Sequence, residues 1–416
     1  MIILKKYFKL HPYVKLVKGK KDCALYDTLQ GRLYSITLAQ YDILNKCTQN
    51  LEVNVLANED RDFLNNLLDK NLGLYYKYKN YIDPQFYGTP HALTDLLKRN
   101  TLKRLFIEIT NQCNLNCCFC KTDSNLFRKT GCKRWECGSK MLSLEQWKSI
   151  IDSAKKLNCR QFIIMGGEPF LELEKLKSIV KYINFDGLSS ITIFTNGVLL
   201  NNLQIIKFIK ENNINLCIQI LSNNDTTYNK MTECNFAYKN IRDSIELIKR
   251  EGIKYGLILL VSRFNEDEVE KICTDFKDSN LRLEFIYPIK NNFYSNRFIN
   301  QIYDRSKNFL KPTLEIFDNN SQYNNCYKGT LAISCDGTAY PCIMSRKLPL
   351  GNVIQIKLHE ILNSELYKKY SNLNKGEIKG CKDCSKRYSC LDCRALEMSA
   401  TRDIHGMKFC NLIEGY

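Results

Sequence analysis

The stretch Cys113-Asn-Leu-Asn-Cys117-Cys-Phe-Cys120 places three cysteines at a spacing of three and then two intervening residues. A ferredoxin-type iron–sulfur cluster is normally closed by four cysteine thiolates. A loop with only three thiolates at this spacing leaves one iron of a 4Fe–4S cluster open for a small molecule. The alternative is a zinc knuckle, with Cys118 or Cys132 as fourth ligand, or a group of buried thiols.

The sequence after this loop alternates strand-like and helix-like patterns up to about residue 290. A capping box at Ser143 to Gln146 marks the start of one helix. The six strands that we expect are Leu105–Ile109, Phe162–Met165, Ile191–Phe194, Leu216–Leu221, Gly256–Val261 and Leu283–Tyr287. Repeating βα units imply a parallel sheet, and six strands are too few for a closed eight-stranded barrel. The sequence therefore predicts an α/β fold with a partial (β/α)6 barrel.

Polar motifs follow each of the predicted strands. The three-cysteine loop follows the first, Gly166-Gly167-Glu168-Pro169 the second, and Thr195-Asn196-Gly197 the third. In α/β barrels the chemistry lies at the C-terminal ends of the strands. The later strands end at, or are followed by, Ser222, Asn265 and Tyr287. We therefore expect all of these groups on one rim.

The motif Gly166-Gly167-Glu168-Pro169 suits a ligand site because glycine, which lacks Cβ, lets the backbone approach a ligand closely. Glu168 can accept a hydrogen bond from an ammonium group. Taken alone the motif is only a turn, and its position after a buried strand is what favours a site. The polar residues further along the rim are weaker candidates, since a loop polar group or an aromatic at the core edge explains them equally well.

Eight further cysteines lie in the last hundred residues. Cys326 and Cys342 flank Gly337, and Cys335 lies between them. The remaining five are Cys381, Cys384, Cys390, Cys393 and Cys410. Two zinc ribbons would also explain the CxxC pairs.

The three-cysteine loop and the glycine-rich motif together resemble the signature of the radical S-adenosylmethionine (SAM) enzymes. In that family SAM chelates the open iron, and an electron from the cluster cleaves it to a 5′-deoxyadenosyl radical. The resemblance implies a 4Fe–4S cluster on Cys113, Cys117 and Cys120. It also implies SAM contacts from Phe119, Gly166, Gly167, Glu168, Pro169, Asn196, Gln219, Ser222 and Asn265.

The C-terminal cysteines resemble the SPASM domain, which usually carries two auxiliary 4Fe–4S clusters. This chain departs from the family pattern once, since Cys390 and Cys393 have two intervening residues and not three. The resemblance implies three 4Fe–4S clusters in all, the first auxiliary cluster on Cys326, Cys342 and Cys393, and the second on Cys381, Cys384, Cys390 and Cys410. Either Cys335 closes the first auxiliary cluster, or one iron of that cluster is open to a substrate thiolate.

The sequence pattern of residues 1–95 predicts a small winged-helix-like unit. Cys23–Asp27 and Arg32–Ile36 flank a hairpin turn, and a capping box at Thr37 to Gln40 opens a helix through Cys47. A second helix runs from Asn58 to Lys70 and ends at Gly73, before a strand over 74–78. Two proline-containing turns over residues 83–90 indicate a linker.

This order of domains resembles the maturases of ribosomally made peptides. It implies leader-peptide recognition by 1–95, a radical SAM partial barrel over 96–300 and a SPASM domain over 301–416. The implied reaction is hydrogen abstraction from a precursor peptide, followed by a thioether or carbon–carbon crosslink. One alternative is a sulfatase-maturase-like enzyme that oxidises a residue to an aldehyde. Another is a non-catalytic iron–sulfur regulator that binds nucleic acid.

Composition is compatible with this interpretation. The 416 residues include 20 cysteines, and neither a signal peptide nor a membrane-spanning stretch is evident. Cysteine-rich chains of this kind indicate metal binding in a reducing cytoplasm. The net charge of +17 is spread along the chain and does not indicate a nucleic-acid partner. We expect a flavodoxin- or ferredoxin-type electron donor, and leave the roles of Cys132 and Cys137 open.

Overall fold

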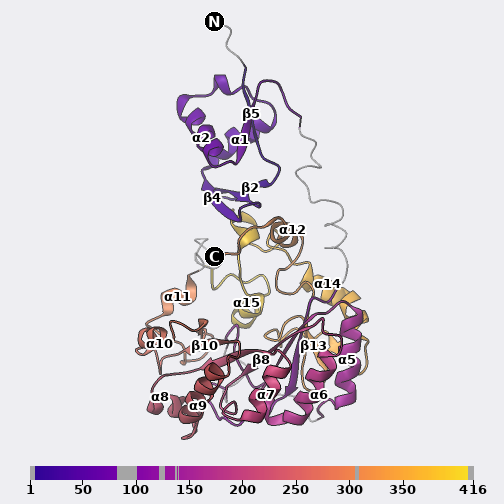
Figure 1. The fold of residues 1–416 in the computed structure, drawn as a ribbon. Helices are drawn as coiled ribbons and strands as arrows, with labels where there is room; N and C mark the ends of the chain where they lie inside the picture. Colours follow the sequence, from indigo (N-terminus) through magenta and orange to yellow (C-terminus); the bar gives the residue numbers. More distant parts are fainter. Residues whose placement is uncertain are drawn as a thin grey trace.

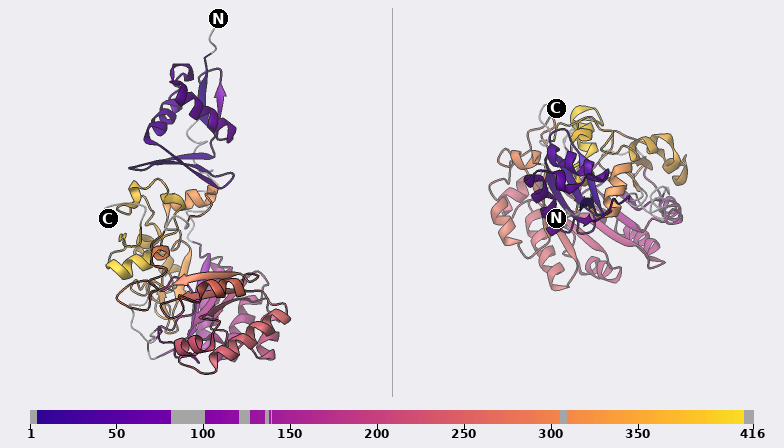
Figure 2. Two further views of the ribbon diagram at one scale, coloured as in Figure 1. Left: turned by 90° about the vertical axis from the view of Figure 1, so that its left-hand side faces the viewer. Right: turned by 90° about the horizontal axis from the view of Figure 1, so that it is seen from above.

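The computed structural model describes residues 5–81, 101–120, 127–135, 138, 140–304 and 309–410. The chain is a mixed α/β protein in three layers along its length (Figures 1 and 2). The N-terminal unit lies at one end and the central sheet with its helices at the other. The cysteine-rich C-terminal segment lies between them. The predicted linker and Cys137 fall outside the described residues.

The central sheet has nine strands in the order β11-β10-β9-β8-β7-β6-β12-β13-β14. Its six predicted strands are present, and each pairs in parallel with its neighbour. They are β6 (Arg104–Thr110), β7 (Gln161–Gly166), β8 (Ser190–Thr195), β9 (Asn215–Ile220), β10 (Tyr255–Val261) and β11 (Leu281–Phe285). Because the strands are parallel, their C-terminal ends lie along one edge of the sheet. The partial-barrel geometry remains a prediction.

Amphipathic helices connect these strands and cover one face of the sheet (Figure 1). The first of them has the predicted capping box, in which Ser143 accepts from the Gln146 N–H at 3.2 Å and Gln146 accepts from the Ser143 N–H at 2.8 Å. Its apolar side buries Trp147 and Ile151. The helices are α5 (Leu144–Lys156), α6 (Leu173–Asn184), α7 (Leu203–Glu211), α8 (Asp225–Thr232), α9 (Ala237–Arg250) and α10 (Val269–Asp275), with the 3-10 turn η2 (Pro169–Glu172) before α6.

The C-terminal segment extends the central sheet. Strand β12 (Thr330–Ile333) pairs in parallel with β6, and β13 (Thr338–Tyr340) and β14 (Gly351–Asn352) continue antiparallel. The sequence did not predict this extension. The other elements of the segment are α11 (Ile299–Tyr303), α12 (Leu314–Gln322), α13 (Leu358–Asn363), α14 (Glu365–Ser371), η3 (Cys381–Asp383), η4 (Arg387–Ser389) and α15 (Arg394–Thr401).

The N-terminal unit has its own hydrophobic core. The expected hairpin is β3 (Cys23–Asp27) with β4 (Arg32–Ile36), and β2 (Val14–Lys18) adds to β3. A second pair joins β1 (Tyr7–Leu10) to β5 (Gly73–Tyr76). The helices are α1 (Leu38–Thr48), which has the predicted capping box, and α2 (Asn58–Asp69), with η1 (Val53–Val55) between them. Its winged-helix character remains a prediction.

One local prediction in this unit is wrong. Gly73 does not end α2, because it begins β5, and the left-handed residue after the helix is Asn71, with φ of 56°. Gly73 is instead required by packing, since a Cβ there would lie 2.4 Å from Cζ of Phe8.

The three-stranded sheet of the N-terminal unit packs on the C-terminal segment. The Tyr26 hydroxyl donates to the Ser385 carbonyl at 2.7 Å and accepts from the Tyr388 N–H at 3.3 Å. Phe317 of α12 packs against both tyrosine rings. The recognition unit that the sequence predicts therefore contacts the loop that carries Cys384 and Cys390. Within the described part of the chain, none of the helices combines the length and apolarity that crossing a membrane requires.

Candidate active site

The three-cysteine loop begins directly after β6, and backbone contacts fix its path. The Cys120 N–H donates to the Cys117 carbonyl at 2.8 Å, and the Cys118 N–H donates to the Met231 carbonyl of α8 at 3.0 Å. Burial, with a smaller contribution from nearby negative charges, raises the pKa of Cys113 to about 11. The pKa of Cys117 is also raised, by burial and by the neighbouring thiols of Cys120, Cys132 and Cys113.

This arrangement fits an iron–sulfur cluster. The thiol of Cys120 contributes to the raised pKa values of both Cys113 and Cys117, so it lies near both of them. Among the described residues, no three potential ligands are grouped as they would be around a bound metal ion. Thiols with raised pKa values release their protons when a metal binds.

Glu168 joins the ends of β7 and β8. It is fully buried, and its carboxylate accepts from the Thr195 hydroxyl at 2.8 and 2.9 Å and from the Asn196 N–H at 2.9 Å. It also accepts from the Phe170 N–H at 3.2 Å, just beyond Pro169, the buried first residue of η2. Burial raises the pKa of Glu168 to about 7. In this structure the Glu168 carboxylate therefore holds the residues after β7 and β8 in fixed positions at the rim.

The glycines before Glu168 permit close backbone packing. The Gly167 N–H donates to the Thr110 carbonyl at 3.0 Å, and a Cβ at Gly167 would lie 1.9 Å from the Gln112 oxygen. Gly166 has a φ of 140°, which favours glycine. These contacts place β7 against the chain that leads into Cys113.

Asn196 connects β8 to the three-cysteine loop. Its side-chain amide donates to Asn114 Oδ1 at 2.8 Å and lies 3.6 Å from Cys113 Sγ. The amide oxygen accepts from the Val198 N–H at 3.0 Å. Of the rim residues that the sequence predicts, Asn196 thus contacts the cysteine loop directly.

Arg128 also lies in the site, and the sequence did not indicate it. Its side chain is fully buried and donates to Gln219 Oε1 at 3.3 Å, and it lies 3.6 Å from Cys120 Sγ. The guanidinium carbon is 5.4 Å from the centre of the buried Phe119 ring. It also bonds to the carbonyl of Cys132, a buried residue. Arg128 therefore brings Phe119, Gln219 and Cys120 together.

Ser222 and Asn265 serve the backbone and neighbouring helices in this structure. The Ser222 hydroxyl bonds to Glu268 and accepts from the Asn224 N–H at 2.8 Å. The Asn265 amide donates to the carbonyls of Leu221 and Leu260 at 2.5 and 2.8 Å. The structure records no contact of these two side chains with the described cysteine loop. Tyr287 is buried against Phe127 and Phe409, as an aromatic at a core edge would be.

A cavity of about 450 Å³ joins the central sheet to the C-terminal segment. Its walls include Phe106, Ile163, Met165 and Phe194 from strands β6 to β8. The opposite wall carries Cys326, Cys342 and Cys393, which are far apart in sequence. Cys326 is exposed at the cavity, and desolvation by the surrounding protein together with the thiols of Cys393 and Cys342 raises its pKa to about 12. Burial and the thiol of Cys393 raise the pKa of Cys342 to about 11.

A second group of thiols lies in the loop that contacts the N-terminal unit. Burial raises the pKa of Cys384 to about 11, and the thiols of Cys390, Cys381 and Cys410 contribute to this rise. Cys335 is in neither group. It is fully buried, disulfide-bonded and outside the walls of the cavity.

Two buried carboxylates on the strands were not predicted as site residues. Glu108 of β6 pairs with Arg346 at 2.5 Å, and Glu284 of β11 accepts from the Lys129 N–H at 2.6 Å. Burial raises the pKa of each to about 7. The signal in the sequence was a charged residue inside an apolar strand. A charged side chain is rarely buried without a partner.

Comparison with known proteins defines the class. Residues 107–276 match the family model of the radical SAM superfamily, and residues 326–385 match that of SPASM, an iron–sulfur cluster-binding domain. The chain therefore contains one segment that matches the radical SAM superfamily, followed by one that matches the SPASM domain. A radical SAM domain implies a 4Fe–4S cluster and SAM, and SPASM domains bind further iron–sulfur clusters.

Individual relatives are distant. GTP 3′,8-cyclase of Synechocystis sp. is 27% identical over 187 residues, which cover 44% of this chain and 54% of that protein. The cyclase of Aquifex aeolicus is 27% identical over 197 residues, 47% of this chain and 58% of the relative. The match thus spans just over half the length of these curated relatives.

Two solved structures share the fold. The structure of anSMEcpe with bound AdoMet and Cp18Cys peptide has a TM-score of 0.53 at 17% identity, covering 74% of this chain and 92% of the other. Streptococcus suis SuiB has a TM-score of 0.51 at 13% identity and covers 97% of this chain and 100% of its own. At these identities the likeness concerns the fold alone.

Proposed function

We propose that this protein is a radical SAM maturase of a ribosomally made precursor peptide. It abstracts a hydrogen atom from one residue of the peptide and installs a thioether or carbon–carbon crosslink. The observation that carries the proposal is the cavity of about 450 Å³ between the central sheet and Cys326, Cys342 and Cys393. A peptide residue held there would contact strands β6 to β8 and, at the same time, the cysteines of the first auxiliary group.

The cofactors would be SAM and three 4Fe–4S clusters, with a flavodoxin- or ferredoxin-type donor. When bound, the clusters and SAM supply the electron, the 5′-deoxyadenosyl radical and an electron acceptor. The three-cysteine loop, with Asn196 and Arg128 against it, would hold the first cluster and orient SAM. Phe106 and Met165 would keep water away from the peptide residue, which protects a radical from side reactions.

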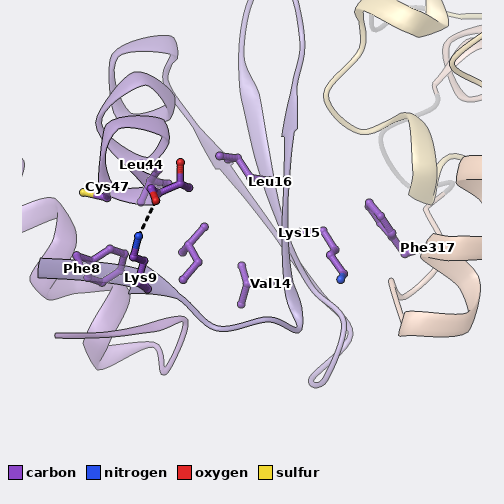
Figure 3. Close-up of a pocket in the computed structure, with 10 residues that line it drawn as sticks. Phe8, Lys9, Val14, Lys15, Leu16, Leu44, Cys47 and Phe317 are labelled. Atoms are coloured by element: carbon purple, nitrogen blue, oxygen red, sulfur yellow. Dashed lines mark hydrogen bonds between the residues drawn. The ribbon is translucent and has the colours of Figure 1, made fainter. Parts of the chain in front are cut away.

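The N-terminal unit offers a groove for the leader. A cavity of about 310 Å³ lies between β1, β2 and α1, lined by Phe8, Leu16 and Leu44 among others (Figure 3). Among the described residues β2 pairs with β3 alone, so its other edge is available for an added strand. Lys15 also lines this cavity, on the side of Phe317 (Figure 3), and its charge favours a leader with acidic as well as apolar residues.

The two alternative functions fit less well. The fold likeness to SuiB extends over 97% of this chain and that to anSMEcpe over 74%. The likeness to SuiB thus extends over more of this chain than the likeness to anSMEcpe does. A nucleic-acid regulator needs neither the cavity nor a glycine-rich rim beside the cysteine loop.

The first test concerns SAM chemistry. The anaerobically reconstituted protein should carry close to three clusters per chain and convert SAM to 5′-deoxyadenosine in the presence of dithionite. Replacing Cys113, Cys117 and Cys120 by alanine should remove one cluster and abolish this conversion. Iron analysis and chromatography of the products measure both. Retained 5′-deoxyadenosine formation in the triple variant would refute the radical SAM assignment.

The second test concerns leader recognition. The probe is a fluorescein-labelled peptide encoded by a small open reading frame beside the gene. Lys15→Glu should weaken its binding roughly tenfold, because the charge reversal opposes an acidic leader. Lys239→Glu, an equal charge change at an exposed position of α9, is the matched control and should leave the affinity unchanged. Equal anisotropy curves for both variants would contradict the groove assignment.

A further inference from the structure

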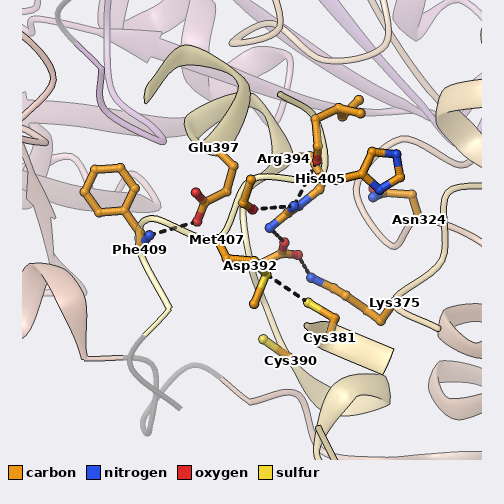
Figure 4. Close-up of polar contacts among 12 residues, drawn as sticks. Asn324, Lys375, Cys381, Cys390, Asp392, Arg394, Glu397, His405, Met407 and Phe409 are labelled. Atoms are coloured by element: carbon orange, nitrogen blue, oxygen red, sulfur yellow. Dashed lines mark hydrogen bonds and ion pairs between the residues drawn. The ribbon is translucent and has the colours of Figure 1, made fainter. Parts of the chain in front are cut away.

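Two buried cations lie beside the C-terminal cysteines, and the proposed function gives them no role. Lys375 is 4% exposed and Arg394 is 3% exposed. Both form ion pairs with the carboxylate of Asp392 (Figure 4). Lysine and arginine are almost never fully buried unless they are paired. A shared carboxylate therefore holds two positive charges inside this segment.

Arg394 is fixed independently of the cysteines. One of its nitrogens donates to the carbonyls of Ile404 and Gly406, both at 2.9 Å. The other buried carboxylate nearby, Glu397, points away and accepts from the Phe409 N–H at 3.1 Å (Figure 4). Arg394 and Asp392 thus form a fixed pair, and Lys375 is the additional cation.

Lys375 lies beside the second group of cysteines (Figure 4), and its partner Asp392 lines the cavity that also holds Cys326 of the first group. Burial lowers the pKa of Lys375. The thiols of Cys390 and Cys381, which belong to the second group, and of Cys326, which belongs to the first, oppose this fall and favour the charged ammonium. The thiol of Cys326 in turn responds to Lys375. Figure 4 shows the Lys375 side chain ending at Asp392, with Cys381 and Cys390 nearby. One buried charge thus acts on both groups.

The physical consequence follows from charge balance. A buried cation is costly unless an opposite charge compensates it. A 4Fe–4S cluster bound by thiolates is negatively charged, and its charge becomes more negative on reduction. Net charge around the cluster is one of the determinants of its reduction potential. A fixed cation that acts on two clusters therefore stabilises the reduced state of each.

We propose that Lys375, held in place by Asp392 and Arg394, is a positioning residue that raises the reduction potentials of both auxiliary clusters. This inference rests on the proposed function, since it requires clusters on both cysteine groups. Its role in the reaction is to make the clusters better electron acceptors for a substrate radical. Lys375 is not among the residues that line the cavity proposed for the peptide.

The experiment is a redox titration of the full-length, anaerobically reconstituted protein, followed by electron paramagnetic resonance. Iron and sulfide analysis first establishes the number of clusters. Lys375→Met should shift both auxiliary signals to more negative potentials. The signal that changes on addition of SAM should keep its potential and serves as an internal reference. Lys375→Arg retains the charge and should keep wild-type potentials. Lys379→Met, at an exposed position four residues away, is the matched control.

The outcomes separate the two proposals. A wild-type protein with a single cluster overturns the proposed function. Three clusters and unchanged potentials in Lys375→Met overturn the inference about Lys375 alone, as does a shift of only one auxiliary signal. If Lys375→Met does not retain its auxiliary clusters, the reduction potentials of the Lys375→Arg variant decide whether the charge has the proposed effect. Wild-type potentials in that variant support the charge effect, and shifted potentials refute it.

Discussion

Replacing Glu284 by glutamine should stabilise the protein at neutral and alkaline pH. Glu284 is 7% exposed on β11, and its carboxylate accepts from the Lys129 N–H at 2.6 Å. Burial raises its pKa from 4.5 to about 7, although Lys129 and Arg128 oppose the rise. A glutamine oxygen can accept the same hydrogen bond, and it carries no charge to desolvate.

The raised pKa determines the sign and size of the effect. The folded state binds the proton of Glu284 more tightly than the unfolded state, so stability falls as the pH rises from 4.5 through 7. At about 1.36 kcal/mol per pKa unit, the ionised carboxylate costs roughly 3 kcal/mol at pH 8. At pH 5 the cost is roughly 1 kcal/mol, because the folded state keeps its proton. Glu284→Gln removes this cost.

Thermal unfolding of the cluster-loaded protein between pH 5 and 8 measures the difference. At pH 8 the Tm of the variant should exceed that of wild type by roughly 5–10 °C, and the gap should narrow at pH 5. Glu246→Gln, on the exposed side of α9 with 69% of its side chain accessible, is the control and should change stability by less than about 0.5 kcal/mol. A Glu284→Gln variant that is no more stable than wild type at pH 8 refutes the reasoning.

Two further predictions concern the C-terminal segment. Arg346→Met should lower the free energy of unfolding by roughly 3–5 kcal/mol, because it leaves the fully buried Glu108 without its cation. Denaturant unfolding measures this, and a loss below about 1 kcal/mol would show that Glu108 is already neutral. Cys335→Ala should leave the iron content unchanged, because Cys335 lies outside the cavity that Cys326, Cys342 and Cys393 share. Loss of about one cluster in that variant, measured as iron per chain, would identify Cys335 as a ligand.

Features with a local cause could be predicted from the sequence. The six parallel strands follow from short apolar runs between helical patterns. The capping boxes at Thr37 and Ser143 follow from two residues three positions apart. The positions of Cys113, Gly167 and Asn196 on one rim follow from the strands that precede them. Each of these signals lies within a few residues of the feature it predicts.

Features with a distant cause could not be predicted. Strand β12 pairs with β6 over a separation that leaves no local pattern. Asn265 has the polarity of a ligand, but its amide satisfies two backbone carbonyls that become neighbours only in the fold. Arg128 lies between Phe127, which forms a bridge with Tyr287, and Lys129, whose N–H donates to Glu284 of β11, and these long-range contacts hold it in the site. Its sequence neighbours give no sign of this.

The pairing of β12 with β6 also delays completion of the sheet during protein synthesis. Arg104 leaves the ribosome long before its partner Thr330. At about 5–20 residues per second, one edge of β6 waits roughly 10–45 s for its neighbour. An unpaired strand edge is a template for pairing with other chains. Strand β12 of the cysteine-rich segment therefore covers the unpaired edge of β6 and protects the newly made domain from aggregation. Chains that end before β12 should accumulate in insoluble form.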